Sequence, residues 1–182
     1  MGRWAAVKAS RHVFLVGFMG SGKTTVGREL ARRRGWEFID LDQAIEKAAA
    51  RTVEAISRDQ GEAAFRRYET AALQDLMHST NSPATRVIAL GGGAFVQPAN
   101  AALISSAGGD VVFLDAPIEE LLRRCRQQPE VARPLLQNES GFRRLYEQRR
   151  PKYLAARIKI DTHRRTISEV VDEMEECLAK RL

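Results

Sequence analysis

Short apolar runs alternate along the chain with longer stretches in which apolar residues recur at helical spacing. The short runs have strand length and predict five β-strands, at His12–Val16, Glu37–Asp40, Arg86–Leu90, Val111–Leu114 and Ile158–Ile160. The longer stretches predict about eight helices, at Lys23–Arg34, Gln43–Ala50, Thr52–Ser57, Glu62–His78, Asn100–Ser106, after Pro117, Phe142–Tyr153 and Ser168–Leu182. This alternation is typical of β-α-β units, so it predicts a three-layer α/β/α domain around a parallel sheet.

One long segment breaks the alternation. Residues 127–140 show no clear period, and loops of that length in a compact domain are commonly functional lids. We therefore expect a mobile lid at about residues 127–140, within a single domain that spans residues 12–182 and follows a tail at residues 1–11.

The composition narrows the class of protein. With 182 residues, of which 44% are hydrophobic and 29% charged, the chain is long enough for one domain with a substantial core. No stretch reaches the roughly 18 apolar residues of a membrane span, so we expect no membrane partner. Cys125 and Cys177 lie outside any C-x-x-C or metal spacing, which favours free thiols and a cytoplasmic protein.

The charge balance is basic, with a formal net charge of +6, and this favours an anionic ligand. The aromatic residues are few and scattered, without the interleaved basic and aromatic positions of a nucleic-acid surface. Several arginines instead fall near loops that follow predicted strands or helices. We therefore expect a small anionic substrate, no nucleic acid, and a chain that acts as a monomer.

The clearest chemical motif follows the first predicted strand. The sequence GFMGSGKT, from Gly17 to Thr24, matches G-x-x-x-x-G-K-[ST] and has a strand before it and a helix after it. Glycines let the backbone wrap with its N–H groups aimed at phosphate oxygens, and the helix N-terminus adds to this attraction. A glycine-rich turn without a ligand is the alternative, and the combination of motif and context argues against it. The residues expected to hold nucleotide phosphates are Gly20, Ser21, Gly22, Lys23, Thr24 and Thr25.

Two side chains of this loop carry specific chemistry. Lys23 supplies a mobile cation for the β- and γ-phosphates, and the hydroxyl of Thr24 is suited to coordinating Mg²⁺. The cofactors that the motif predicts are therefore ATP and Mg²⁺.

A pair of carboxylates ends the second predicted strand. Asp40 and Asp42 form a D-x-D pair, and residues two apart in an extended segment face the same side. One could hold Mg²⁺ through water while the other orients or deprotonates an acceptor hydroxyl, although an aspartate here could equally cap a helix. Asp115 is a rival metal ligand, because it ends an apolar strand that looks like a Walker B segment.

These features occur in an order that resembles shikimate kinase, a family of P-loop small-molecule kinases. The resemblance covers about residues 12–180, and its separate motifs are far more specific together than the phosphate loop alone. The matching stretches are GFMGSGKTTVGRELA (Gly17–Ala31), FIDLD (Phe38–Asp42), GEAAFRRYE (Gly61–Glu69), LGGGAF (Leu90–Phe95), RPLL (Arg133–Leu136) and RRPKY (Arg149–Tyr153). The resemblance implies the P-loop kinase fold with a five-stranded parallel sheet, and transfer of the γ-phosphate of ATP to the 3-hydroxyl of shikimate in aromatic amino-acid biosynthesis.

The resemblance also implies which residues bind the acceptor. Asp42 would contact the shikimate hydroxyls and act as the base, and Gly92 would offer its backbone N–H to the substrate. Arg66 and Arg149 would bind the shikimate carboxylate, with Glu69 supporting Arg66. Judged from spacing alone, Arg66 could instead form an ordinary helical ion pair.

On the donor side, the resemblance implies a metal site at Thr24 and Asp40, which demotes Asp115. Arg133 would reach the ATP phosphates from the lid. The adenine would contact Arg126, seven residues before Arg133, and Arg165 in the segment 161–166. The expected catalytic residues are Asp42, Lys23 and Arg133.

The sequence also allows two other functions. One is a different P-loop kinase for a small polyhydroxy acid such as gluconate, which a substrate panel would separate from shikimate phosphorylation. The other is a sensing domain that binds shikimate without turnover, against which the intact Lys23, Asp42 and Arg133 argue.

Overall fold

The computed structural model describes residues 12–78, 85–127 and 138–180. The expected tail at residues 1–11 and the lid residues 128–137 lie outside the described residues. The described strands are β1 (Val13–Val16), β2 (Glu37–Asp40), β3 (Arg86–Ala89), β4 (Asp110–Asp115) and β5 (Ile158–Asp161). The described helices are α1 (Lys23–Arg34), α2 (Leu41–Ala49), α3 (Val53–Gln60), α4 (Glu62–His78), α5 (Pro98–Ser106), α6 (Ile118–Arg126), α7 (Glu139–Tyr153) and α8 (Ile167–Ala179).

The five described strands form one parallel sheet in the order β2-β3-β1-β4-β5, which confirms the predicted fold class. Strand β1 is central, and its residue Val13 lies opposite Val87 of β3 on one side and Asp110 of β4 on the other. The chain moves from β1 toward one edge of the sheet and later crosses β1 toward the other edge. This reversal opens a crevice at the carboxyl ends of the strands, directly beside the loop that follows β1.

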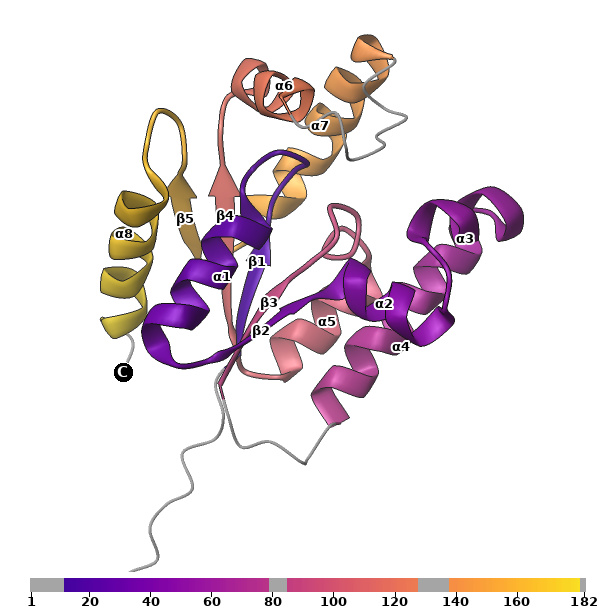
Figure 1. Ribbon diagram of the computed structural model, residues 1–182, viewed down its shortest axis with the longest axis horizontal. Helices are drawn as coiled ribbons and strands as arrows, with labels where there is room; N and C mark the ends of the chain where they lie inside the picture. Colours follow the sequence, from indigo (N-terminus) through magenta and orange to yellow (C-terminus); the bar gives the residue numbers. More distant parts are fainter. Residues whose placement is uncertain (1–11, 79–84, 128–137, 181–182) are drawn as a thin grey trace, which may run out of the picture.

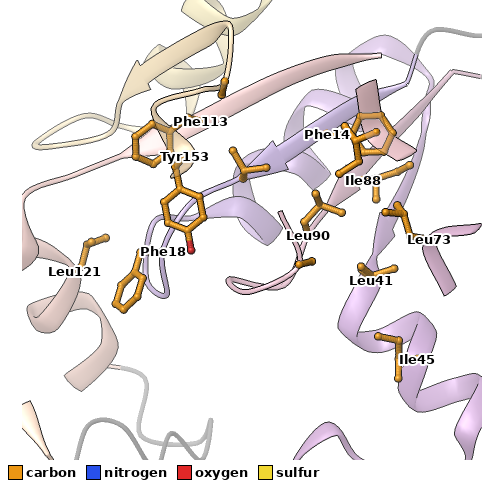
Figure 2. Packing of buried hydrophobic residues seen from close by; sticks show 14 of the residues in the cluster. Phe14, Phe18, Leu41, Ile45, Leu73, Ile88, Leu90, Phe113, Leu121 and Tyr153 are labelled. Atoms are coloured by element: carbon orange, nitrogen blue, oxygen red, sulfur yellow. The ribbon is translucent and has the colours of Figure 1, made fainter. Parts of the chain in front are cut away.

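Helices cover both faces of the sheet (Figure 1). Helices α1 and α8 lie side by side over one face, where strand residues such as Leu15 and Val112 pack against them. On the other face, Phe14, Ile88 and Phe113 pack in a cluster that includes residues of α4, α5, α6 and α7 (Figure 2). Neighbouring strand residues therefore alternate between two hydrophobic cores, as expected when side chains point to opposite faces of a sheet.

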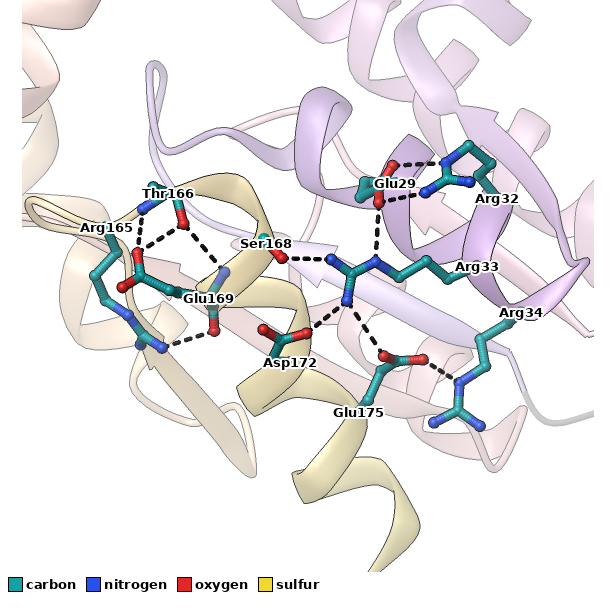
Figure 3. Close-up of polar contacts among 10 residues, drawn as sticks. All are labelled: Glu29, Arg32, Arg33, Arg34, Arg165, Thr166, Ser168, Glu169, Asp172 and Glu175. Carbon is teal, nitrogen blue, oxygen red and sulfur yellow. Dashed lines mark hydrogen bonds and ion pairs between the residues drawn. The ribbon is translucent and has the colours of Figure 1, made fainter.

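The seam between α1 and α8 is also held by ion pairs (Figure 3). Arg33 of α1 donates to Glu29 on its own helix and to Ser168 and Asp172 of α8, over 2.6–2.9 Å. Arg34 pairs with Glu175 at 2.5 Å. Several charges that share partly buried guanidinium groups stabilise more than an isolated surface pair. The seam therefore ties the helix after the phosphate loop to α8 over the stretch from Ser168 to Glu175, which begins just after the loop that joins β5 to α8.

Helices α2 and α7 begin two and three residues earlier than the hydrophobic pattern predicts, and a capping side chain explains each start. Helix α2 begins at Leu41 because the Asp40 carboxylate caps it, accepting from the backbone N–H groups of Asp42 and Gln43. Helix α7 begins at Glu139, inside the expected lid, because the Asn138 side chain caps its first turn. The cap predicted for the helix after Thr52 is confirmed, since its hydroxyl accepts from the N–H of Ala55.

Two further expectations concern single features of the chain. Both cysteines are free thiols, as predicted, with Cys125 buried and Cys177 partly buried. Among the described helices, none combines the length and the apolar character needed to cross a bilayer.

Candidate functional site

A cavity of about 1100 Å³ opens at the carboxyl ends of the strands. Its walls come from the phosphate loop, the β2–α2 junction, the glycines after β3, helix α6, the end of α7 and the β5–α8 loop. Ligands of open parallel sheets bind at this edge, and the volume is large enough for a nucleotide together with a small acceptor.

The phosphate loop joins β1 to α1 and requires glycine at more than one place. Gly20 and Gly22 have φ of +82° and +94°, a left-handed region that residues with a Cβ rarely adopt. A Cβ at Gly20 would also lie 2.8 Å from Cys125 Sγ and 2.9 Å from the Leu121 carbonyl oxygen. Helix α6 therefore packs against the outside of the loop, which leaves the inner side of the loop to the cavity.

Lys23 is the first residue of α1, and its side chain folds back over the loop. Its Nζ donates to the carbonyl oxygens of Gly17 and Phe18, at 3.0 and 3.1 Å. The ammonium group is thus held at the mouth of the loop, within the cavity lining. A cation fixed there faces the region in which phosphate oxygens would bind.

Thr24 and Asp40 meet across the floor of the cavity. The Thr24 hydroxyl donates to Asp40 Oδ2 at 2.8 Å, while Asp40 Oδ1 caps α2. Asp40 can therefore both cap α2 and contribute to a metal site, as the sequence suggests, because each role uses a different carboxylate oxygen. A hydroxyl and a carboxylate beside the phosphate loop are hard oxygen donors of the kind that Mg²⁺ prefers, so these residues fit that ion.

Asp42 lies in the first turn of α2, so the premise that the D-x-D pair is extended throughout is wrong. Both aspartates nevertheless line the same cavity. Asp42 Oδ1 is buried and has no hydrogen-bond partner within the described residues. Burial, together with the charge of Asp40, raises the pKa of the Asp42 carboxyl, and Lys23 opposes that shift. Such a group is suited to accepting a proton from a substrate hydroxyl.

Arg66 of α4 makes both of the helical ion pairs that its spacing allows, with Glu62 at 2.8 Å and with Glu69 at 2.5 Å. It does not line the large cavity but a smaller one of about 280 Å³. A Cβ on Gly93 would overlap the Arg66 guanidinium, so Arg66 packs directly against the triple-glycine turn.

Glu69 connects Arg66 to the acceptor side of the large cavity. Its Oε2 accepts from Arg66 Nη1 and from Gln97 Nε2, the latter at 2.9 Å. Its Oε1 is buried without a partner among the described residues and lies over Gly91, beside Asp42. Burial raises the pKa of Glu69, and the bond from Arg66 opposes that shift.

Gly92 and Arg149 both line the large cavity, as the sequence predicts. Arg149 lies near the end of α7, and its Nη1 would be 3.4 Å from a Cβ placed on Gly92. The hydroxyl of Tyr153, one helical turn further on, donates to the Gly92 carbonyl oxygen. The predicted acceptor residues thus fall into two groups, with Asp42, Gly92 and Arg149 in the cavity and Arg66 behind Glu69.

The far end of the cavity is lined by α6 and the β5–α8 loop. Arg124 spans these elements, donating to the Thr162 carbonyl oxygen at 2.6 Å and to the Thr162 hydroxyl at 3.0 Å. Its partner on its own helix is Glu120, at 2.7 Å. Arg165 also lines the cavity, while its guanidinium donates to the Glu169 carbonyl oxygen and to the Glu173 carboxylate of α8.

Three other residues considered from the sequence are not brought to this cavity. Arg126 is exposed and pairs with Glu139 at 2.5 Å, outside the cavity lining. Asp115 also lies outside the lining and accepts from Arg150 at 2.7 Å, which fits its demotion as a metal ligand. Arg133 lies outside the described residues.

Sequence reasoning missed Arg124, Thr162 and Gln97. Arg123, Arg124 and Arg126 occupy one helical turn, and no pattern in the sequence separates Arg123 and Arg124, which line the cavity, from Arg126, which does not. Thr162 and Gln97 act through contacts with residues distant in the chain, so local spacing carries no signal for them.

Comparison with known proteins identifies a consistent set of relatives. A family model described as shikimate kinase matches residues 19–179. The chain is 37% identical over 165 residues to the shikimate kinase of Persephonella marina, an alignment that covers 90% of this chain and 96% of that protein. It is 40% identical over 181 residues to a shikimate kinase of Thermus thermophilus, covering 98% of this chain and 95% of the relative.

Solved structures agree with this set. The shikimate kinase from Acinetobacter baumannii, solved in complex with shikimate, superposes with a TM-score of 0.85 at 34% identity and covers 97% of both chains. A gluconokinase from Sinorhizobium meliloti superposes with a TM-score of 0.66 at 18% identity, covering 94% of this chain and 93% of that one. The likeness to the gluconokinase concerns the fold alone.

Proposed function

This chain belongs to the shikimate kinase family, and from that premise we propose how its residues carry out the reaction. The enzyme transfers the γ-phosphate of ATP to the 3-hydroxyl of shikimate and uses Mg²⁺. The observation that carries the residue assignment is the meeting of Asp42, the Thr24–Asp40 pair and the phosphate loop in one cavity. One reacting phosphate can then be reached by the base that takes the hydroxyl proton, by the oxygen ligands for Mg²⁺ and by the groups of the loop that bind phosphate.

On the donor side, the N–H groups of residues 20–25 and the Lys23 ammonium bind the phosphates of ATP. Thr24 and Asp40 would hold Mg²⁺, and the bound ion would neutralise charge on the phosphates. Because Lys23 is already hydrogen-bonded to the loop backbone, little reorganisation is needed when the phosphates arrive.

On the acceptor side, Asp42 binds the 3-hydroxyl and takes its proton as the oxygen attacks the γ-phosphorus, while ADP leaves with the bridging electron pair. The raised pKa of Asp42 brings its basicity closer to that required of a general base. Most of the rate enhancement comes from holding the hydroxyl in line with the γ-phosphate, since phosphoryl transfer depends chiefly on positioning and charge.

The shikimate carboxylate pairs with Arg149 and Arg66, and the Gly92 N–H contacts the substrate. Arg149 already lines the cavity, whereas Arg66 is paired with Glu62 and Glu69. The Glu62 carboxylate is exposed, so we expect the substrate carboxylate to replace it on Arg66, with Glu69 remaining in place. Arg66 then loses an exposed ion pair with Glu62 and gains a charge-assisted pair with the substrate carboxylate that is sheltered from water.

At the nucleotide end, we assign the base-side contact to Arg124 in place of Arg126. The Arg124 guanidinium crosses from α6 to the β5–α8 loop and lines the cavity, and Arg165 lines the same end. The assignment of Arg133 to the ATP phosphates rests on its RPLL motif alone.

A substrate panel with Mg-ATP tests the activity. A coupled assay of ADP release should show turnover with shikimate well above the background without acceptor, and much less with gluconate. Turnover with gluconate alone would favour the other kinase class, and shikimate binding without turnover would favour a sensing domain.

We also propose that the chain acts as a monomer in the cytoplasm, without nucleic acid or membrane. Both cysteines are free thiols, which fits a reducing compartment. Light scattering at assay concentration would test the monomer, since a stable dimer would double the measured mass.

A further inference from the structure

We propose that Tyr153 is a positioning residue for the acceptor half of the site, because its hydroxyl fixes the Gly92 carbonyl beside the Arg149 guanidinium. The inference rests on the proposed roles of Gly92 and Arg149. The position of Tyr153 in the hydrophobic core does not by itself account for this role.

The ring of Tyr153 is rigidly held. It is the last residue of α7, it is 1% exposed, and its ring lies 5.4 Å from that of Phe113 on β4 (Figure 2). Burial raises the pKa of the phenol to about 12, so the hydroxyl keeps its proton throughout the working pH range. The side chain is thus a fixed hydrogen-bond donor at the end of a packed ring.

The Tyr153 hydroxyl donates its hydrogen bond to the carbonyl oxygen of Gly92. Gly92 is the middle residue of a turn made of three glycines, which have no side chains to restrict the backbone. A bond to the Gly92 carbonyl restrains rotation on the C-terminal side of its Cα. The backbone N–H of Gly92, which is proposed to contact the substrate, lies on the other side of that Cα. Because the peptide that follows Gly92 is fixed, the position of this N–H is restrained as well.

Arg149 lies near the same hydroxyl, and its charge opposes the rise in the pKa of the Tyr153 phenol. Arg149 and Tyr153 are four residues apart on α7 and therefore lie on the same face of the helix. A Cβ placed on Gly92 would be 3.4 Å from Arg149 Nη1 and 3.7 Å from Tyr153 Oη, so the three groups converge. A phenol that donates its proton to Gly92 keeps lone pairs on its oxygen, and these favour a guanidinium cation nearby.

The competing explanation is that Tyr153 serves only the core, with its hydroxyl bond satisfying a buried polar group. The two explanations differ in what loss of the hydroxyl should change. A core role predicts lower stability with unchanged substrate binding. A positioning role predicts weaker shikimate binding, with ATP binding unchanged because Tyr153 is outside the nucleotide half of the cavity lining.

The test is Tyr153→Phe, which retains the packed ring. Tyr146→Phe is the matched control, because Tyr146 lies on the same helix and its hydroxyl donates to the Ala116 carbonyl oxygen, at 3.3 Å, away from the cavity lining. We would measure KM for shikimate and for ATP, kcat, and shikimate binding by calorimetry in both variants and the wild type.

We expect Tyr153→Phe to raise KM and Kd for shikimate about ten-fold, with kcat and KM for ATP within about two-fold of the wild type. Tyr146→Phe should leave all four quantities unchanged. Wild-type shikimate affinity in Tyr153→Phe, or an equal loss in both variants, would overturn the inference while leaving the proposed function intact. Absence of turnover in the wild type would instead overturn the proposed function and this inference with it.

Discussion

Asp42 and Glu69 bring one carboxylate oxygen each to the same point above Gly91. A Cβ on Gly91 would lie 2.7 Å from Asp42 Oδ1 and 2.9 Å from Glu69 Oε1. Both oxygens are buried and lack a hydrogen-bond partner within the described residues. Unsatisfied buried acceptors are costly, so Asp42, which lines the cavity, is suited to receiving a hydroxyl group of a bound substrate, with Glu69 packed behind it.

Gly91→Ala should therefore damage the acceptor half of the site. The new methyl group would displace two buried carboxylates, and we expect kcat/KM for shikimate to fall at least about ten-fold and stability to fall by about 1–3 kcal/mol. Steady-state kinetics and chemical unfolding measure the two effects. Nucleotide binding serves as the control, and a variant with normal kcat/KM would show that the two oxygens need not meet above Gly91.

Asp42 should set the acidic limb of the pH profile. Only the ionised carboxylate accepts a proton, so kcat falls as the pH falls through its pKa, which burial raises above the ordinary value of 3.8. We expect the limb to lie above pH 3.8, and Asp42→Asn to lower kcat by roughly 10²–10⁴-fold with ATP binding retained. A limb at the ordinary value, or near-normal turnover in the variant, would contradict the assigned role.

Gln97 should act on shikimate through Glu69 and Arg66. Its amide donates to Glu69 Oε2 at 2.9 Å, beside the bond from Arg66. We expect Gln97→Ala to raise KM for shikimate by about three- to ten-fold with little change in kcat, because a net hydrogen bond of this kind contributes about 1 kcal/mol. Gln74→Ala is the matched control, since Gln74 lines the same small cavity without contacting Glu69. Equal effects of both changes would indicate a general disturbance of α4.

His12 should make stability depend on pH. Burial and the nearby charge of Arg86 lower the pKa of His12 from its usual 6.5, and Glu37 opposes the shift. The unfolded chain therefore takes up the proton first, so this stabilising contribution is full above about pH 6.5 and is lost as the pH falls below it.

The measurement is the free energy of unfolding between about pH 8 and pH 5.5. We expect the wild type to lose up to about 1.4 kcal/mol per pH unit in the lower part of this range, and His12→Gln to show a flatter profile. His78→Gln, which changes an exposed histidine, should leave the slope unchanged. Identical slopes in the wild type and His12→Gln would show that another group titrates.

The sequence predicts most of the fold because the relevant signals are local. The alternation of strand and helix patterns, together with the glycines of the phosphate loop, predicts the parallel sheet and places Lys23, Thr24 and Asp40 at its crevice. Helix α2 begins at Leu41, two residues before the hydrophobic pattern predicts, because the Asp40 carboxylate caps it. Helix boundaries depend on a few side-chain hydrogen bonds, which hydrophobic periodicity does not encode.

The rest of the site depends on contacts between distant segments. The bond from Tyr153 to Gly92 joins residues 61 positions apart, and the bond from Gln97 to Glu69 joins residues 28 apart. Such contacts follow from how α4, α5 and α7 pack against the sheet. The resemblance to a family supplies Arg66 and Arg149 as expected residues, but it does not supply the separation of Arg66 from the large cavity.

At the nucleotide end of the cavity, the sequence and the structure point to different arginines. The family resemblance implies Arg126 as the adenine contact, whereas the structure brings Arg124 to the cavity and leaves Arg126 exposed beside Glu139. We expect Arg124→Gln to raise KM for ATP about ten-fold or more, because it loses a cation of the cavity wall and the bonds to Thr162. Arg126→Gln should change KM for ATP less than about two-fold, since an exposed ion pair contributes little. Steady-state kinetics and calorimetry with an ATP analogue would measure both, and the reverse order of effects would return the adenine contact to Arg126.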